Sequence, residues 1–156
     1  MRILIISDSH GRTENVEILK KKEGKFDLVI HCGDGIEDFN YFSELFNCPV
    51  TGVSGNCDMF SNEPKFLNLN IEDRIIHIEH GNHLPVFSKK DLLDFAEGNS
   101  YDVILYGHTH YQSIISRDRF RVINPGSISR PRDGAPSYII MITDGKGNFT
   151  FEEKRL

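Results

Sequence analysis

Long apolar runs are missing from this sequence. No apolar stretch approaches the roughly 18 residues that a membrane-spanning helix requires. The apolar stretch after Arg2 ends at Ser7 and Asp8, which is too short for the core of a signal peptide and is typical of a β-strand. We therefore expect a cytoplasmic protein with no membrane partner.

Cysteine is also scarce, with three residues in a chain of 156. They form no CxxC pair, and their odd number excludes a complete disulfide framework. Reduced thiols of this kind suit a cytoplasmic protein. A cysteine-nucleophile phosphatase is excluded as well, because it needs an arginine six residues beyond its cysteine. Six residues beyond Cys32, Cys48 and Cys57 the chain carries Asp38, Ser54 and Glu63.

Positive charge is in deficit, since the formal net charge is −5. An extended nucleic-acid-binding surface normally shows a basic excess, so we expect none here. A small phosphate ligand held by metal ions remains compatible with this charge. The chain also shows no internal repeat, low-complexity segment or linker, and its length suits one domain, residues 1–156, with its own core.

The hydrophobic pattern predicts an α/β fold. Apolar strands at 3–6, 26–31 and 49–53 alternate with helices at 13–22 and 36–46, which indicates parallel strands joined by right-handed crossovers. Thr13 is the expected N-cap of the first helix. Beyond residue 60 the pattern changes from alternating strands and helices to predicted β-hairpins. We expect two mixed β-sheets, packed together and flanked by helices. The later predicted elements are hairpins at 65–71/74–80, 112–117/120–124 and 137–143/148–153, a helix at 88–97 and a strand at 102–106.

Polar side chains able to bind metal follow several of these strands. Each taken alone is more often a capped or solvated polar group. Together they are more telling, because glycines accompany nearly all of them and allow a backbone to approach a ligand closely. Oxygen and imidazole ligands without thiolate suit Mn²⁺, Fe, Ni²⁺ or Zn²⁺. The residues concerned are Asp8, His10, Asp34, Asn56, His80, His108 and His110.

This series resembles the calcineurin-like metallophosphoesterase superfamily. The segments that carry the resemblance are Asp8-Ser9-His10, Gly33-Asp34, Gly55-Asn56-Cys57-Asp58, His80-Gly81 and Gly107-His108-Thr109-His110. The small size and the late segments Asn124-Pro125-Gly126-Ser127 and Arg130-Pro131-Arg132 resemble its YfcE-type phosphodiesterase branch. The resemblance implies a four-layer sandwich that hydrolyses small phosphodiesters by attack of a metal-bridging hydroxide.

The same resemblance implies two divalent metal ions, with Mn²⁺ as the first expectation and Ni²⁺, Fe²⁺ or Zn²⁺ as alternatives. One ion would be bound by Asp8, His10 and His110. The other would be bound by Asn56, His80 and His108, and Asp34 would bridge the two. A shared carboxylate offsets the repulsion between two dications held ~3.5–4 Å apart.

One position departs from the family pattern. Many members carry a histidine where this chain has Cys57, and that histidine is thought to assist the leaving group with help from the neighbouring acid, here Asp58. A thiol with a pKa of about 8.5 is a poor substitute because it is a weak hydrogen-bond donor. The catalytic candidates are therefore Asp34, Asn56, Cys57 and Asp58, with His83 as a competing proton donor.

The remaining candidates have two readings each. Arg12, His83, Arg130 and Arg132 are candidates for contact with the substrate phosphate, or are exposed residues of loops and turns. His31 and His77 are expected to be structural histidines with satisfied hydrogen bonds. The chief alternative for the whole protein is a non-catalytic scaffold like the retromer subunit, which has the same fold. A homo-oligomer is also left open.

Overall fold

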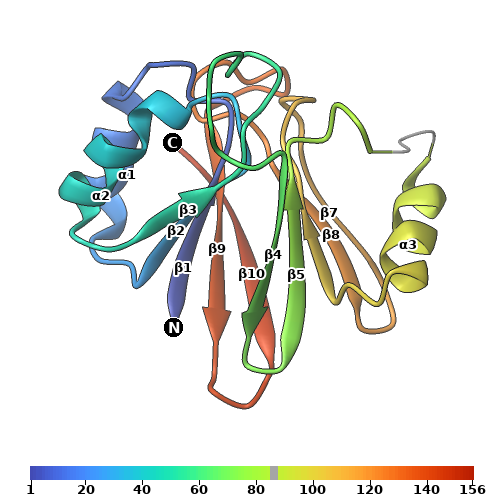
Figure 1. Ribbon diagram of the computed structural model, residues 1–156. Coiled ribbons are helices and arrows are strands. Elements are labelled where there is room, and N and C mark those ends of the chain that lie inside the picture. Colours follow the sequence, from blue (N-terminus) through green and yellow to red (C-terminus); the bar gives the residue numbers. More distant parts are fainter. Residues whose placement is uncertain (85–87) are drawn as a thin grey trace.

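The apolar strand segments form two five-stranded sheets in the computed structural model, which describes residues 1–84 and 88–156 (Figure 1). The first sheet has the order β10-β9-β1-β2-β3 and the second the order β4-β5-β6-β8-β7. Both are mixed: the parallel strands occupy one side of the first sheet and the centre of the second. The predicted pair of mixed sheets is confirmed.

In the first sheet, β1 (Arg2–Ile6), β2 (Leu28–His31) and β3 (Val50–Gly52) run parallel. Strand β9 (Ser137–Thr143) pairs antiparallel with β1, and β10 (Phe149–Arg155) completes the predicted C-terminal hairpin. Helices α1 (Glu14–Glu23) and α2 (Phe39–Phe46) cover the outer face of this sheet (Figure 1).

In the second sheet, β5 (Arg74–Glu79), β6 (Val103–Leu105) and β8 (Phe120–Pro125) run parallel. The edge strands β4 (Phe66–Ile71) and β7 (Gln112–Arg117) pair antiparallel with β5 and β8, as the two predicted hairpins require. Helix α3 (Lys89–Gly98) lies on the outer face of this sheet (Figure 1). None of the helices in the described ranges is long and apolar enough to cross a membrane.

Strand β1 is buried on both of its faces, as a continuous apolar strand should be. Ile3 and Ile5 point between the two sheets, into a core that also contains Ile76 and Ile78 of β5. Leu4 and Ile6 point the other way, toward α1 and α2. A third cluster joins α3 to the outer face of the second sheet. Helix, sheet, sheet and helix therefore form the expected four layers.

Two local predictions are confirmed in position and differ in detail. Helical structure covers the expected range 36–46, but its first part is a 3₁₀ turn, Ile36–Asp38, where the Asp38 carboxylate is buried against Ser9 and the Gly11 amide. Thr13 is the N-cap residue of α1, but its hydroxyl caps no backbone N–H in the described part of the chain, since its backbone is already in the right-handed helical region. By contrast, Ser88 caps α3, because its backbone is extended and its hydroxyl accepts from Asp91 N.

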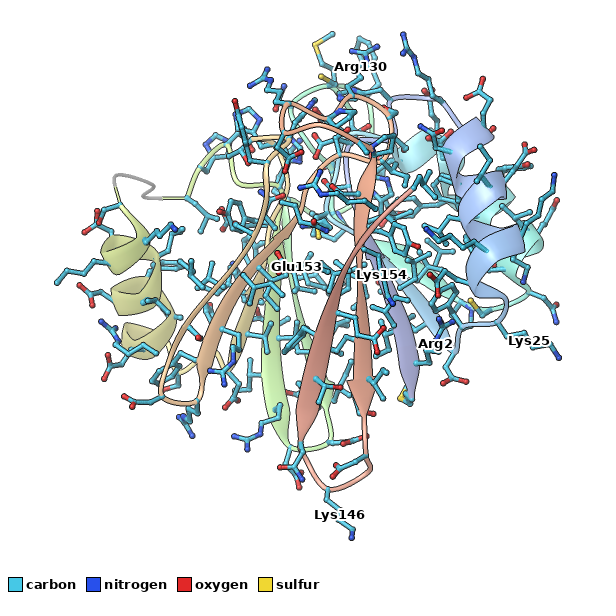
Figure 2. All side chains as sticks on the ribbon, turned by 180° about the vertical axis from the view of Figure 1, so that it is seen from behind. Arg2, Lys25, Arg130, Lys146, Glu153 and Lys154 are labelled. Atoms are coloured by element: carbon cyan, nitrogen blue, oxygen red, sulfur yellow. The ribbon has the colours of Figure 1, made fainter. Side chains whose placement is uncertain are left out.

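All the parallel strands end on the same side of the molecule. In Figure 1 the arrowheads of β9 and β4 point away from the end where the long loops gather. Their antiparallel partners β1 and β5 therefore run toward that end, together with the strands parallel to them, β2, β3, β6 and β8. Figure 2 places Arg130 in these loops, at the end opposite Lys146 in the β9–β10 turn. Ligands bind at such carboxyl-terminal strand ends in open α/β sheets. The topology thus fixes where a site can form.

Candidate metal centre

Three of the predicted ligands meet at the ends of β1 and β6. Asp8 Oδ1 lies 3.1 Å from His110 Nε2 and 3.9 Å from His10 Nε2. The three residues each offer one ligand atom within 4.8 Å of the others. Asp8 and His10 lie two positions apart on one loop, whereas His110 comes from the other sheet. The first predicted ligand group is therefore brought together by the packing of the two sheets.

A second group adjoins the first around Asp34, which follows β2. His80 Nε2 lies 3.3 Å from Asp34 Oδ2 and 3.1 Å from Asn56 Oδ1. The rings of His80 and His108 have their centroids 5.1 Å apart. Asp34 also forms a potential metal group with Asp8 and His80. Asp34 thus lies where the two ligand groups meet.

The hydrogen bonds of this site leave metal-binding atoms unused. Within residues 1–84 and 88–156, Asp8 Oδ1 and His10 Nε2 are buried and have no hydrogen-bond partner. A buried polar atom without a partner costs about 1–3 kcal/mol. The other carboxylate oxygen, Asp8 Oδ2, accepts from His108 N. These orphaned atoms therefore fit a cation as their missing partner.

Two of the histidines are held in the tautomer that a metal requires. His80 Nδ1 lies 2.8 Å from the carbonyl oxygen of Cys32, and His110 Nδ1 lies 2.6 Å from that of Arg130. A carbonyl only accepts, so Nδ1 carries the proton in each ring, and Nε2 of the neutral ring keeps its lone pair. Such outer hydrogen bonds are the usual support of histidine ligands.

The backbone at the ligands is unusual, and sequence reasoning did not anticipate this. Left-handed φ values are uncommon outside glycine and cluster at functional sites, where the surrounding structure holds them. At Asp8 the hydroxyls of Ser127 and Ser129 both donate to the backbone carbonyl and so support this conformation. The only signal in the sequence is residue type, because Asp, Asn and His tolerate this region best. The ligands with positive φ are Asp8, His10, Asp34, His108 and His110.

Two glycines in the loops allow close approach to the ligands, as the sequence predicted. A Cβ on Gly55 would overlap the Asp34 carboxylate. A Cβ on Gly107 would overlap Ser7 Oγ and crowd Asp8 Oδ2. Both positions leave no room for a side chain.

The carboxylates and imidazoles shift each other's pKa values. Burial disfavours charge on Asp34, but the neighbouring His80 imidazole and the Cys57 amide outweigh it and hold the pKa of Asp34 well below its usual range. Burial likewise opposes charge on His80, and Asp34 overcomes it, so the pKa of His80 is raised. The Asp8 carboxylate raises the pKa of His110. Asp34 is therefore ionised at neutral pH, and the site favours positive charge beside its acids.

Asp58 has an anchoring role that the sequence did not reveal. Its Oδ2 accepts from the amides of Asp34 and Gly55, both at 2.8 Å, and its Oδ1 accepts from Gly35 N at 3.1 Å. The Cys57 amide in turn donates to Asp34 Oδ1 at 2.8 Å. The loop after β3 is thereby tied to the loop after β2, and Asp34 is fixed between them.

Sequence reasoning did foresee a structural role for His31, though not its partners. Gly33 N donates to His31 Nδ1, so Nε2 carries the proton and donates to Ser9 Oγ at 3.0 Å. The Ser9 hydroxyl then donates to Asp38 Oδ2 at 2.6 Å. This buried chain links the loops that present Asp8 and Asp34. His77, the other histidine expected to be structural, lies between Asn68 Oδ1 and Glu79 Oε2 and stacks on Tyr101.

A cavity of about 560 Å³ opens beside the ligands. Arg130 is exposed and lines it, as a phosphate contact would require. Arg12 and Arg132 are exposed and lie outside the described lining. His83 is exposed as well and lines a separate hollow of about 70 Å³ with His80. Of the four candidate phosphate contacts, the structure places Arg130 at the cavity.

The sheets, the strand-end loops and the clustered carboxylates and imidazoles define a metallophosphoesterase. A family model described as the calcineurin-like phosphoesterase superfamily domain matches residues 1–146, and the chain belongs to that superfamily.

Curated relatives agree with this assignment. The chain is 41% identical over 138 residues to a Bacillus subtilis protein named "Probable metallophosphoesterase YsnB", covering 85% of this chain and 78% of the relative. It is 32% identical over 165 residues to a phosphodiesterase of Methanocaldococcus jannaschii, covering 94% of this chain and 95% of the relative. These names support a metal-dependent phosphoesterase.

Solved structures show the same fold. The chain matches the Escherichia coli phosphoesterase YfcE with a TM-score of 0.65 and 25% identity over 92% of this chain and 90% of that one. It also matches Vps29 of Entamoeba histolytica, solved with zinc, with a TM-score of 0.78 over 99% of both chains. At 20% identity the second likeness shows the fold alone.

The amide contacts of Asp58 predict a dual effect of Asp58→Asn. The amide side chain presents an NH₂ group to backbone N–H donors, so the free energy of unfolding should fall by about 2 kcal/mol. Metal affinity should fall as well, because the loop that holds Asp34 loses its anchor. Chemical denaturation and metal titration measure the two quantities. Glu63→Gln, which removes a charge from an exposed position of the same loop, is the control and should change neither. Full stability and metal affinity in Asp58→Asn would contradict the anchoring role.

The burial of His31 predicts a pH-dependent stability. Burial lowers the pKa of His31 from 6.5 to about 4. Between these values the unfolded chain binds a proton that the folded protein excludes, so stability falls as pH falls from about 6.5 to about 4, by up to about 3 kcal/mol. His31→Asn keeps an acceptor for Gly33 N and removes the titration. Urea unfolding with a chelator present should therefore show a shallower pH dependence than wild type, and equal slopes would refute this account.

Proposed function

We propose that this protein hydrolyses small phosphodiesters with two divalent cations, Mn²⁺ being the first candidate. The observation that carries the proposal is the position of Asp34 between two adjoining ligand groups. The first group contains Asp8, His10 and His110, and the second contains Asn56, His80 and His108. Cations bound there would generate a hydroxide nucleophile at neutral pH and stabilise charge on the phosphoryl group.

The protein's own residues supply the rest of the arrangement. Asp8 and Asp34 bring buried negative charge that offsets the repulsion between two cations. The carbonyls of Cys32 and Arg130 orient His80 and His110, so their Nε2 atoms face the site without rearrangement. The Arg130 side chain at the cavity is suited to a phosphate oxygen. We also propose a cytoplasmic location and a single domain, on the basis of the free cysteines and the composition.

Assistance to the leaving group is the weak part of this chemistry. The Asp34 carboxylate and burial raise the pKa of the Cys57 thiol to about 11, so the thiol is neutral at pH 7 but a poor proton donor. Both carboxylate oxygens of Asp58 accept hydrogen bonds from backbone amides. They are therefore not used to orient a neighbouring side chain that could act as general acid. We infer that the enzyme depends on leaving groups that depart with little protonation.

The scaffold alternative explains less of the molecule. The Vps29 likeness supports a shared fold, but fold alone does not set function. A protein that served only in assembly would have no need for buried, orphaned ligand atoms or for histidines fixed with Nε2 toward the site. The ligand positions in this chain all hold residues able to bind metal, which favours catalysis.

The bridging role predicts that Asp34→Asn loses metal and activity together. The substitution keeps the shape of the side chain but removes a charge shared by both cations. Loss of a residue that only hydrogen-bonds to a metal ligand typically lowers metal affinity about 10- to 100-fold. Loss of the bridging charge should therefore lower it by at least about 100-fold. Metal content of the purified protein and hydrolysis of an aryl phosphodiester, before and after chelation, are the measurements. Asp118→Asn, at the exposed β7–β8 turn, is the matched control. A fully metallated and active Asp34→Asn variant would exclude the bridge.

The substituted position predicts a steep dependence on leaving group. Nitrophenyl diesters should react far faster than alkyl diesters, and Cys57→His should accelerate alkyl diesters by part of the about 10²–10⁴-fold that a general acid provides. Cys57→Ser removes the thiol without adding an acid and should resemble wild type. If His83 already donates the proton, His83→Ala will slow alkyl diesters selectively and Cys57→His will add nothing. A flat leaving-group dependence in all variants would refute the inference.

A further inference from the structure

Two large, highly exposed apolar side chains line the cavity beside the candidate metal ligands. Phe60 is 96% exposed and Met59 is 77% exposed, and both line the cavity together with His10 and Asp34. The other exposed large hydrophobic residues in the described part of the chain are at most 63% exposed and are scattered. Single exposed apolar residues are ordinary on a protein surface. Two consecutive ones in the lining of a cavity suggest that a ligand covers them.

The turn that carries these residues is held firmly against the metal site. Ser61 N donates to the carbonyl oxygen of Asp58 at 3.2 Å, so Met59 and Phe60 occupy the centre of a turn that begins at Asp58. The Asp58 side chain is itself bound to the amides of Asp34, Gly35 and Gly55. The position of Phe60 is therefore tied to the loops that present the metal ligands.

The cavity lining combines two kinds of side chain. The carboxylate of Asp34, the imidazole of His10 and the guanidinium of Arg130 suit cations and a phosphoryl group. Phe60, Met59 and the half-buried Ile36 are apolar. At about 560 Å³ the cavity is within the range that encloses whole organic ligands and is far larger than a phosphate needs. Phe60 offers a ring face, and flat aromatic groups stack on such faces.

We propose that Phe60, supported by Met59, is a specificity-determining residue that stacks on a flat aromatic group of the phosphodiester substrate. This inference rests on the proposed function, because the phosphoryl group must sit at the metal ligands for the organic group to reach the turn. A nucleobase and a simple aryl ring share the required chemistry, and the test separates them.

Binding of non-hydrolysable phosphonates to the Mn²⁺-loaded protein tests the proposal without turnover. Methylphosphonate measures the contribution of the metal centre alone. Phenylphosphonate adds an aryl ring to it, and a nucleoside phosphonate adds a nucleobase. We expect an aromatic phosphonate to bind about 10- to 100-fold more tightly than methylphosphonate, in line with the usual worth of base–aromatic stacking. Whichever aromatic ligand binds more tightly identifies the source of the ring.

Variants locate the effect. Phe60→Ala should bring the aromatic-to-methyl affinity ratio close to one and leave methylphosphonate affinity unchanged, whereas Phe60→Trp should keep the ratio. Tyr41→Ala, an exposed aromatic residue on α2 outside the described cavity lining, is the matched control and should behave as wild type. An equal ratio in wild type and Phe60→Ala would overturn the proposal.

Two further outcomes distinguish this inference from the proposed function and from a subunit interface at the same turn. If wild type binds aromatic phosphonates through Phe60 but hydrolyses no diester, the proposed function fails while the aromatic subsite stands. If light scattering shows a wild-type dimer that Phe60→Ala converts to a monomer, with the affinity ratio unchanged, the apolar turn belongs to a subunit interface and the subsite is overturned.

Discussion

Burial of β1 on both faces is the constraint on which the rest of this structure depends. Ile3 and Ile5 fill the space between the sheets, while Leu4 and Ile6 pack against the helical layer. A strand fixed in this way cannot slip by one residue without turning its apolar side chains around. Its end point is therefore fixed, and with it the place where Asp8 leaves the core. The other parallel strands end at the same side of the molecule (Figure 1).

Burying the charged groups of this site is unfavourable, and its hydrogen bonds show how that free energy is offset. Asp8 and Asp34 are buried, and buried charges require partners. Backbone amides supply part of the compensation: His108 N binds Asp8, and Cys57 N binds Asp34. Protonated imidazoles supply another part, which is why Asp34 and Asp8 raise the pKa values of His80 and His110. Cations bound by these residues would take the place of those protons, so metal binding should release protons and weaken at low pH.

The loop after β3 serves several purposes at once. Asp58 fastens it to the loop after β2, the Cys57 amide orients Asp34, and the turn beyond Asp58 contributes Phe60 to the cavity lining. Position 57 was expected to matter only for protonating the leaving group. Its backbone and its neighbour Asp58 instead position Asp34, one of the candidate metal ligands, whatever the side chain at 57 does in catalysis.

The sequence by itself predicted two mixed sheets flanked by helices and the parallel run of the first three strands, because hydrophobic periodicity is a local pattern. Polar residues at the strand ends, together with the family resemblance, supplied the set of candidate metal ligands. The sequence did not show that residues 36–38 form a 3₁₀ turn or that the Thr13 hydroxyl makes no capping hydrogen bond in the described part of the chain, since both depend on the backbone conformation that tertiary contacts impose. Only the tertiary structure decided that His110 of one sheet meets Asp8 of the other, and that His31, Ser9 and Asp38 form a buried chain. It also set the left-handed backbone at five candidate ligands and placed Phe60 in the lining of the cavity. These features arise between segments far apart in the chain, where packing and hydrogen bonding, rather than local preference, select the conformation.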